Sequence, residues 1–122
     1  QEIEFEVSDF AAARRFLEAL GYRVFTTYEK IRENFTLAGV QVSLDEMPFG
    51  NFTELEGPNP EAIRKLAESL GLAWERRIAM SYLELFARLK TRLALPFDDL
   101  TFEAFRDRTI RPEDLGVQPA DG

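Results

Sequence analysis

The sequence contains no cysteine and no histidine among its 122 residues. The absence of cysteine excludes disulfide bonds and thiolate chemistry, and it fits a cytoplasmic protein. The absence of histidine removes the commonest general base and the usual zinc ligand, so Ser–His and Cys–His nucleophile systems are excluded within this chain. Any metal ion must therefore bind carboxylate oxygens, which favours Mg²⁺, Mn²⁺ or Ca²⁺.

The sequence also lacks a long apolar run and an excess of positive charge. Because no stretch of about eighteen apolar residues occurs, we expect no membrane-spanning segment. The formal net charge of -7 argues against a basic groove for nucleic acid. A local cluster of cations could still bind a small phosphorylated ligand. The length allows one domain at most, and eleven phenylalanines predict aromatic packing between helices and a sheet.

The central stretch, residues 28–57, predicts three short strands joined by tight turns at Ala38-Gly39 and Pro48-Phe49-Gly50. Within each strand, charged residues alternate with apolar ones, and strand side chains point to alternate faces. One face of the predicted sheet therefore gathers side chains from all three strands: Lys30, Arg32 and Asn34, then Gln41, Ser43 and Asp45, then Phe52, Glu54 and Glu56. This spacing can aim two cations and three carboxylates at one space.

The remaining elements surround that sheet. Strict alternation predicts a further strand over residues 2–7, and residues 22–27 read as another extended segment. Helices are predicted from Ser8 or Asp9 to about Leu20, over 60–70, and over 78–93, with a short helix after Thr101 and a surface tail over 111–122. The chain thus gives about five strands and three or four helices. The fold class is α+β, an antiparallel sheet with flanking helices whose edges stay exposed unless another segment completes it.

Two pairs of side chains on the central sheet suit chemistry. Glu54 and Glu56 stand two residues apart, so both carboxylates point the same way and, with Asp45, offer hard oxygen ligands for a divalent cation. Lys30 and Arg32 suit phosphate oxygens, with arginine as a planar fork and lysine as a point charge. Each set alone also fits a solvated strand face or cross-strand ion pairs. Their combination on adjacent strands favours a site for a phosphate–metal complex.

Four segments resemble the second half of a CYTH domain: EIEFEV, YEKIRENF, VQVSLDEMPFGNFTELEGP and SYLEL. This is the triphosphate tunnel metalloenzyme family, which includes class IV adenylate cyclases and thiamine triphosphatases. The resemblance extends to about Leu85 and implies an eight-stranded antiparallel tunnel with a charged interior. It also implies Mg²⁺ or Mn²⁺ and a triphosphate substrate such as ATP, thiamine triphosphate or tripolyphosphate. We expect residues 1–95 to form the C-terminal half of such a domain, and residues 96–122 to add a short helix and a surface tail.

The resemblance implies roles for individual residues. By position, Lys30 and Arg32 match the phosphate-binding cations of the family and are the residues expected to bind substrate and to act in catalysis. Asp45, Glu54 and Glu56 match its carboxylates near the metals, with the two glutamates as the foremost ligands.

The first residues match the family less completely. Glu2 and Glu4 match the glutamate-rich strand that opens the second half of the domain, where a carboxylate lines the tunnel and meets the substrate. The family's N-terminal E-x-E-x-K strand has Glu6 in place of the lysine here. We therefore expect that the first half of the domain is missing from this chain, either because the chain is a fragment or because the partner half comes from a second copy in a homodimer.

Three hypotheses about function follow. The first is a CYTH enzyme, a cyclase or a triphosphatase, in which positioning and charge stabilisation drive phosphoryl chemistry. The second is a non-catalytic module that binds polyphosphate or a nucleotide, or an inactive half-domain. A third, an α+β scaffold with surface ion pairs only, predicts that charge removal at Glu54 and Glu56 leaves metal affinity unchanged. Trp74 and Tyr82 are predicted to pack in the core rather than against a base.

Overall fold

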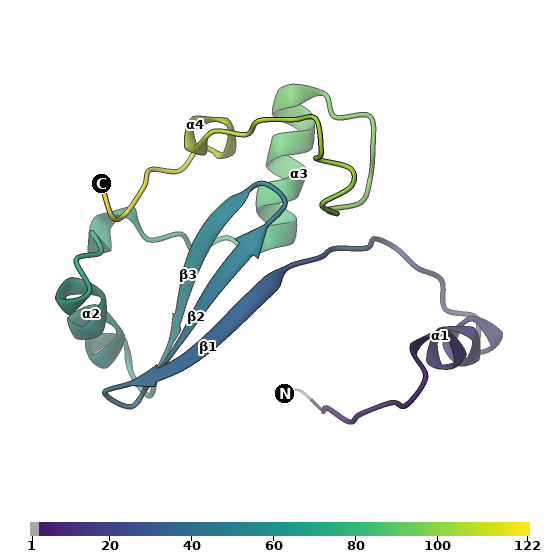
Figure 1. The fold of residues 1–122 in the computed structure, drawn as a ribbon, viewed down its shortest axis with the longest axis horizontal. Helices are drawn as coiled ribbons and strands as arrows, with labels where there is room; N and C mark the ends of the chain where they lie inside the picture. The colour runs from purple at the N-terminus through teal and green to yellow at the C-terminus, as the bar shows by residue number, and fades with distance from the viewer. Residues whose placement is uncertain (1–2) are drawn as a thin grey trace.

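The computed structural model describes residues 3–122, so the predicted site residue Glu2 lies outside the described residues. The elements are α1 (Phe10–Ala19), β1 (Ile31–Leu37), β2 (Val40–Met47), β3 (Gly50–Glu56), α2 (Pro60–Ser69), the 3₁₀ turn η1 (Trp74–Arg76), α3 (Tyr82–Leu93) and α4 (Pro112–Leu115). Figure 1 shows the sheet at the centre, with α2 near one end, α3 and α4 near the other, and α1 set apart. The fold is α+β, as predicted.

The sheet is a three-stranded antiparallel meander in the order β1-β2-β3. Both connections have two turn residues, because Leu37 pairs with Val40 and Met47 pairs with Gly50. The first turn has positive φ at both positions, 49° at Ala38 and 75° at Gly39, which is the twist that suits a two-residue hairpin. These turns fix the register.

The two faces of the sheet pack differently. On one face, Val40, Val42 and Leu55 contact Leu66 and Ala62 of α2. This contact follows from the strand alternation and from the apolar stripe predicted for the second helix. The opposite face carries the polar residues and opens toward α3. The sheet therefore separates a small apolar core from the candidate site.

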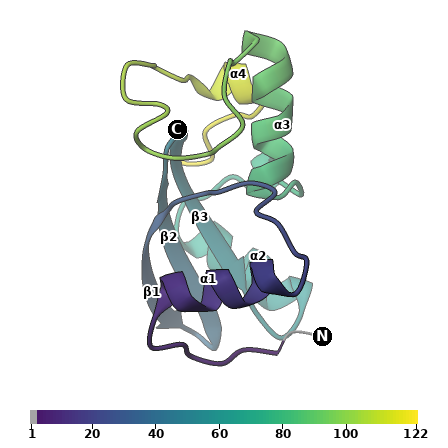
Figure 2. The same ribbon diagram turned by 90° about the vertical axis from the view of Figure 1, so that its right-hand side faces the viewer.

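The larger core lies at the α3 end and is built from the β2–β3 turn, α3, the segment after it, and α4. Its buried members are Met47, Phe49, Leu85, Phe86, Leu89, Leu95, Leu100, Phe105 and Leu115. Phe49 is a turn residue, yet it is only 2% exposed. Its ring meets Phe52 and Phe105 edge-on, with centroids 5.6 and 6.4 Å apart. Aromatic packing between helix and sheet is thus confirmed. Figure 2 shows α3 and α4 gathered beyond the end of the strands.

The first two long helices share one construction. Each begins at a side chain that accepts a hydrogen bond from a backbone N–H, Asp9 from Ala12 and Asn59 from Ala62. Each is followed by a glycine with positive φ, 96° at Gly21 and 77° at Gly71. These are the start and stop signals that the sequence predicts. Within residues 3–122, each helix is too short or too polar to cross a bilayer.

Two predictions about the later helices are wrong in detail. The helix α3 begins at Tyr82 rather than at Ile78, because Ser81 and Glu84 form a reciprocal capping box that fixes its first turn. The segment after Thr101 forms turns rather than a helix, although the Thr101 hydroxyl accepts a hydrogen bond from the Ala104 N–H at 3.2 Å.

The N-terminal segment departs most from prediction. Residues 3–7 and the expected extended segment 22–27 form no strand, and the next residue, Tyr28, makes only an isolated bridge with Leu100. The expected count of about five strands is therefore wrong for the described residues, which hold three. The reason is physical: a strand needs a neighbour for its backbone N–H and C=O groups, and no strand among the described residues pairs with residues 3–7. None of the α1 residues is buried, and Phe16 is 66% exposed.

Candidate functional site

A buried ion pair lies at the centre of the polar face. Arg32 on β1 stands directly opposite Asp45 on β2. The guanidinium donates from Nε to Oδ1 and from Nη2 to Oδ2, both at 2.6 Å. The Asp45 side chain is completely buried, whereas that of Arg32 is 29% exposed. Nη2 also donates to Oε2 of Glu54 on β3 at 2.7 Å, so one guanidinium joins all three strands.

A tyrosine hydroxyl completes the pair. Tyr82, the first residue of α3, donates from Oη to Oδ2 of Asp45 at 2.6 Å. Its ring packs edge-on against Phe52, with centroids 5.3 Å apart. The Lys30 ammonium lies 5.9 Å from the centroid of the same ring. The prediction that Tyr82 packs in the core is thus confirmed for the ring only, because its hydroxyl belongs to the polar site. Nothing in the local sequence pattern indicates that contact.

The electrostatics of this cluster follow from its contacts. The hydrogen bonds from Arg32 lower the pKa of Asp45, against the opposing effect of burial, and Tyr82 lowers it further. The same contact with Asp45 raises the pKa of Arg32. Burial, and then the hydrogen bond to Asp45, raise the pKa of Tyr82. At neutral pH the cluster therefore holds a charged pair and a protonated tyrosine that can only donate to it.

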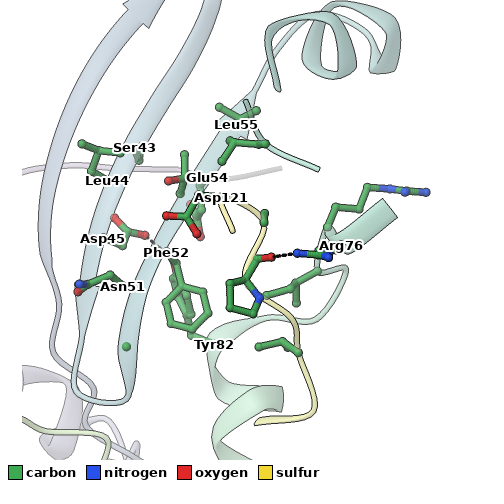
Figure 3. Close-up of a pocket in the computed structure, with 18 of the residues that line it drawn as sticks. Ser43, Leu44, Asp45, Asn51, Phe52, Glu54, Leu55, Arg76, Tyr82 and Asp121 are labelled. Carbon is green, nitrogen blue, oxygen red and sulfur yellow. Dashed lines mark hydrogen bonds between the residues drawn. The ribbon is translucent and has the colours of Figure 1, made fainter. Parts of the chain in front are cut away.

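A cleft of about 1040 Å³ opens along this face of the sheet. It is lined by residues of all three strands, Arg32 among them, and of α2, η1, the start of α3, α4 and the last residues of the chain. Figure 3 shows Asp45, Glu54, Phe52 and Tyr82 around the same space, with Asp121 of the C-terminal tail beside them. A pocket of this size holds a ligand as large as a nucleotide.

The tail over 117–122, predicted to lie on the surface, is held at the cleft by hydrogen bonds to η1 and its cap. Arg76 Nη1 donates to the carbonyl oxygens of Pro119 and Gly122 at 2.7 and 3.0 Å. The Ala73 N–H donates to the carbonyl of Ala120 at 2.8 Å. The tail thereby forms one wall of the cleft.

The structure brings together most of the predicted site. Arg32, Asp45 and Glu54 are in direct contact, and Lys30 lies beside Tyr82. Glu56 lies two residues from Glu54 on the same face and pairs in register with Gln41. Glu4 lies apart from this group, in the exposed N-terminal segment.

The acidic residues fit a metal ion only in part. Among residues 3–122, no three acidic side chains are grouped as they stand to hold a metal. Asp45 is engaged by three hydrogen bonds, two from Arg32 and one from Tyr82. Glu54 and Glu56 are both exposed, and their carboxylates share one face of β3. Two hard oxygen donors at this spacing fit Mg²⁺ or Mn²⁺, which complete their shells with water and phosphate.

The comparisons with known proteins decide the family. The family model for the CYTH domain matches residues 1–89. The chain belongs to the CYTH domain family. Its matched region contains the whole sheet, α2 and the start of α3 with Tyr82, so every residue of the Arg32–Asp45 cluster lies inside it. The resemblance to triphosphate tunnel metalloenzymes is confirmed, and the three-stranded sheet is consistent with part of a CYTH tunnel. No curated protein and no solved structure gave a significant match.

Proposed function

We propose that this protein is a metal-dependent CYTH enzyme that acts on a small-molecule triphosphate. One observation carries the proposal: a partly exposed guanidinium is held at the floor of a cleft, next to carboxylates that can take a divalent cation. Arg32 is fixed by Asp45 beneath it and by Glu54 beside it. Membership in a family that includes triphosphate-processing enzymes supports the same reading.

Arg32 and Lys30 are the groups that would bind and orient the phosphates. Asp45 and Glu54 engage Nε and Nη2 of Arg32, and within residues 3–122 its Nη1 has no hydrogen-bond partner in the structure. That N–H group can therefore donate to a phosphate oxygen without breaking the bidentate pair. Lys30 is half-buried against the Tyr82 ring and would add a point charge. Held in place, both cations stabilise charge that develops on the transferred phosphoryl group.

Glu54 and Glu56 are the residues that would hold Mg²⁺ or Mn²⁺, although Oε2 of Glu54 already accepts a hydrogen bond from Arg32. Such an ion neutralises phosphate charge and polarises the phosphoryl oxygens. Asp45, predicted as a third ligand, would join them only by giving up a hydrogen bond to Arg32 or Tyr82. Its present contacts favour a role in holding Arg32.

The second candidate is a module that binds triphosphate without turnover, and the open sheet favours it. Within the described residues, β1 has a strand neighbour on one side only. A tunnel needs further strands and further cations around the phosphates. We propose that a preceding N-terminal half or a second copy of the chain supplies them, and this chain alone then binds without turning over.

Product analysis tests both candidates. The protein is incubated with ATP, thiamine triphosphate and inorganic tripolyphosphate, each with Mg²⁺ or Mn²⁺, and products are separated by ion exchange. Cyclic AMP with pyrophosphate identifies a cyclase, and orthophosphate identifies a phosphohydrolase. The Glu54→Gln/Glu56→Gln variant is expected to lose turnover. The matched Glu61→Gln/Glu68→Gln variant on the exposed surface of α2 is expected to keep it.

A titration of tripolyphosphate by calorimetry separates the outcomes. Binding without turnover supports the binding module and points to a missing half. If this chain neither binds nor turns over tripolyphosphate, both candidates are overturned. Equal activity in the Glu54→Gln/Glu56→Gln variant and the wild type overturns the metal assignment.

A further inference from the structure

Tyr82 contacts one cation of the candidate site, Lys30, directly and the other, Arg32, through Asp45. Its hydroxyl donates to Oδ2 of Asp45 at 2.6 Å, the same oxygen that accepts Nη2 of Arg32 at 2.6 Å. Its ring lies 5.9 Å from the Lys30 ammonium. One side chain of α3 therefore links two cations that lie two residues apart at the beginning of β1. None of the predicted phosphate or metal roles uses this residue.

The position of the Tyr82 ring is fixed by its surroundings. The ring packs against Phe52 at 5.3 Å and Phe49 at 6.4 Å, measured between centroids. Its backbone is fixed because the Ser81 and Glu84 capping box closes the first turn of α3 at that residue. Because the hydroxyl oxygen lies in the plane of the ring, a fixed ring also fixes the position of Oη, which is within hydrogen-bond distance of Asp45 Oδ2.

Tyr82 contacts the cluster without adding charge to it. Asp45 and Glu54 already pair with Arg32, and the Tyr82 O–H adds a neutral donor to Asp45 rather than another carboxylate. The ring attracts the Lys30 ammonium through its quadrupole and carries no net charge. A carboxylate in that position would hold Lys30 more strongly and would repel a phosphate.

We propose that Tyr82 is a positioning residue for the two phosphate-binding cations, acting on Arg32 through Asp45 and on Lys30 through its ring face. The phosphate part of this inference rests on the proposed function. The geometric part does not, because the order of the Arg32 side chain is measurable without any ligand.

The first test uses Tyr82→Phe, which keeps the ring and removes the hydroxyl. Its matched control is Tyr22→Phe, at a residue that is 66% exposed. In the ligand-free protein, ¹⁵N NMR follows water exchange of the Arg32 Nε–H, a signal assigned by its loss in Arg32→Lys. We expect exchange to rise about tenfold in Tyr82→Phe, the scale of one hydrogen bond to a charged group. We expect no change in Tyr22→Phe. Unchanged exchange in Tyr82→Phe overturns the inference.

The second test asks whether Tyr82 acts through Arg32. Calorimetry measures the affinity for inorganic tripolyphosphate with Mg²⁺ in Tyr82→Phe, in Arg32→Lys and in the double variant. We expect about a tenfold loss for Tyr82→Phe in the wild-type background and little further loss in the Arg32→Lys background, since coupled residues are non-additive. Equal losses in both backgrounds overturn the inference, because Tyr82 then acts independently of Arg32.

The third test addresses the ring. Tyr82→Leu removes ring and hydroxyl together, so its affinity is compared with that of Tyr82→Phe. We expect a further loss of about threefold, in the range of an exposed cation–π contact, and expect it to vanish when Lys30→Met is also present. A further loss that persists in the Lys30→Met background assigns the ring a packing role only and overturns this part.

Failure of the inference is distinguishable from failure of the proposed function. If the wild type binds no tripolyphosphate, the proposed function is overturned, and the Arg32 Nε–H exchange still decides whether Tyr82 positions Arg32. If the wild type binds and Tyr82→Phe binds equally well with a normal amide spectrum, the proposed function survives and the inference is overturned.

Discussion

Arg32 and Asp45 face each other across β1 and β2, and one guanidinium binds both oxygens of one carboxylate at 2.6 Å. The pair joins a cation that reaches the cleft to an anion with no exposed surface. Such a pair is costly to break, because removal of one partner leaves the other desolvated and unpaired. The first predictions concern this relationship.

Asp45→Asn is expected to destabilise the protein by about 2–3 kcal/mol, somewhat below the range for a wholly buried pair, because Arg32 keeps contact with water and with Glu54. Urea unfolding followed by circular dichroism would show a lower midpoint at an unchanged slope. The control is Asp107→Asn, at an exposed residue, with an expected change within about 0.5 kcal/mol. Equal midpoints for both variants would contradict the buried-pair assignment.

Stability is expected to fall in acid in a way that depends on Asp45. Folding lowers the pKa of Asp45 below its reference value of 3.8, chiefly through the hydrogen bonds from Arg32. The stability that Asp45 contributes is therefore complete above the unfolded-state pKa and is lost as the pH falls through the folded-state pKa. Urea midpoints measured from about pH 6 to about pH 2.5, a range that spans the reference carboxylate pKa, would test this. The gap between wild type and Asp45→Asn should narrow below about pH 4. A gap that stays constant over this range would refute the lowered pKa.

Ala38→Asn is expected to stabilise the first hairpin. Ala38 has φ of 49°, a left-handed conformation that costs an alanine about 1–2 kcal/mol and that asparagine tolerates better. The change creates an Asn-Gly turn, and we expect a gain of about 0.5–1 kcal/mol in the free energy of unfolding. Gly39→Ala serves as the opposite case, because its φ of 75° disfavours a side chain. A loss of stability in Ala38→Asn would show that the left-handed conformation is not maintained in solution.

Phe49→Ala is expected to cost about 3–5 kcal/mol, because it empties a buried position between Phe52, Tyr82 and Phe105. The same change at Phe25, which is 94% exposed, should cost little. Thermal unfolding compares the two variants directly. Similar losses at both positions would mean that Phe25 is covered in solution.

The central sheet could be predicted from the sequence because the information that specifies it is local. Alternation with a period of two assigns each side chain to a face, and two-residue turns fix the register, so Arg32, Asp45 and Glu54 were expected on one face. The helix α2 was predictable for a similar reason, since Asn59 and Gly71 mark its ends.

The contacts that the sequence did not predict depend on docking. Tyr82 and Asp45 are 37 residues apart, and nothing local indicates which strand the start of α3 meets. Phe49 sits in a turn, a location that usually predicts exposure, and is buried because the hairpin tip inserts between α3 and the segment around Phe105. The alternation in residues 2–7 predicts a half-buried strand, which residues 3–7 do not form, because a strand also requires a partner and the local pattern contains no information about one.

The length of the two-residue turn at Ala38 and Gly39 determines the charge of the side chain that stands opposite Asp45. One extra residue in that connection would shift β1 by one position against β2, and every β1 side chain would change face. Arg32 would then turn toward the α2 side, and Glu33 or Ile31 would stand opposite Asp45. With Glu33 in that place, two carboxylates would oppose each other at the position where the Arg32 guanidinium now meets Asp45. The length of the hairpin loop thus determines whether a cation or a second carboxylate faces Asp45.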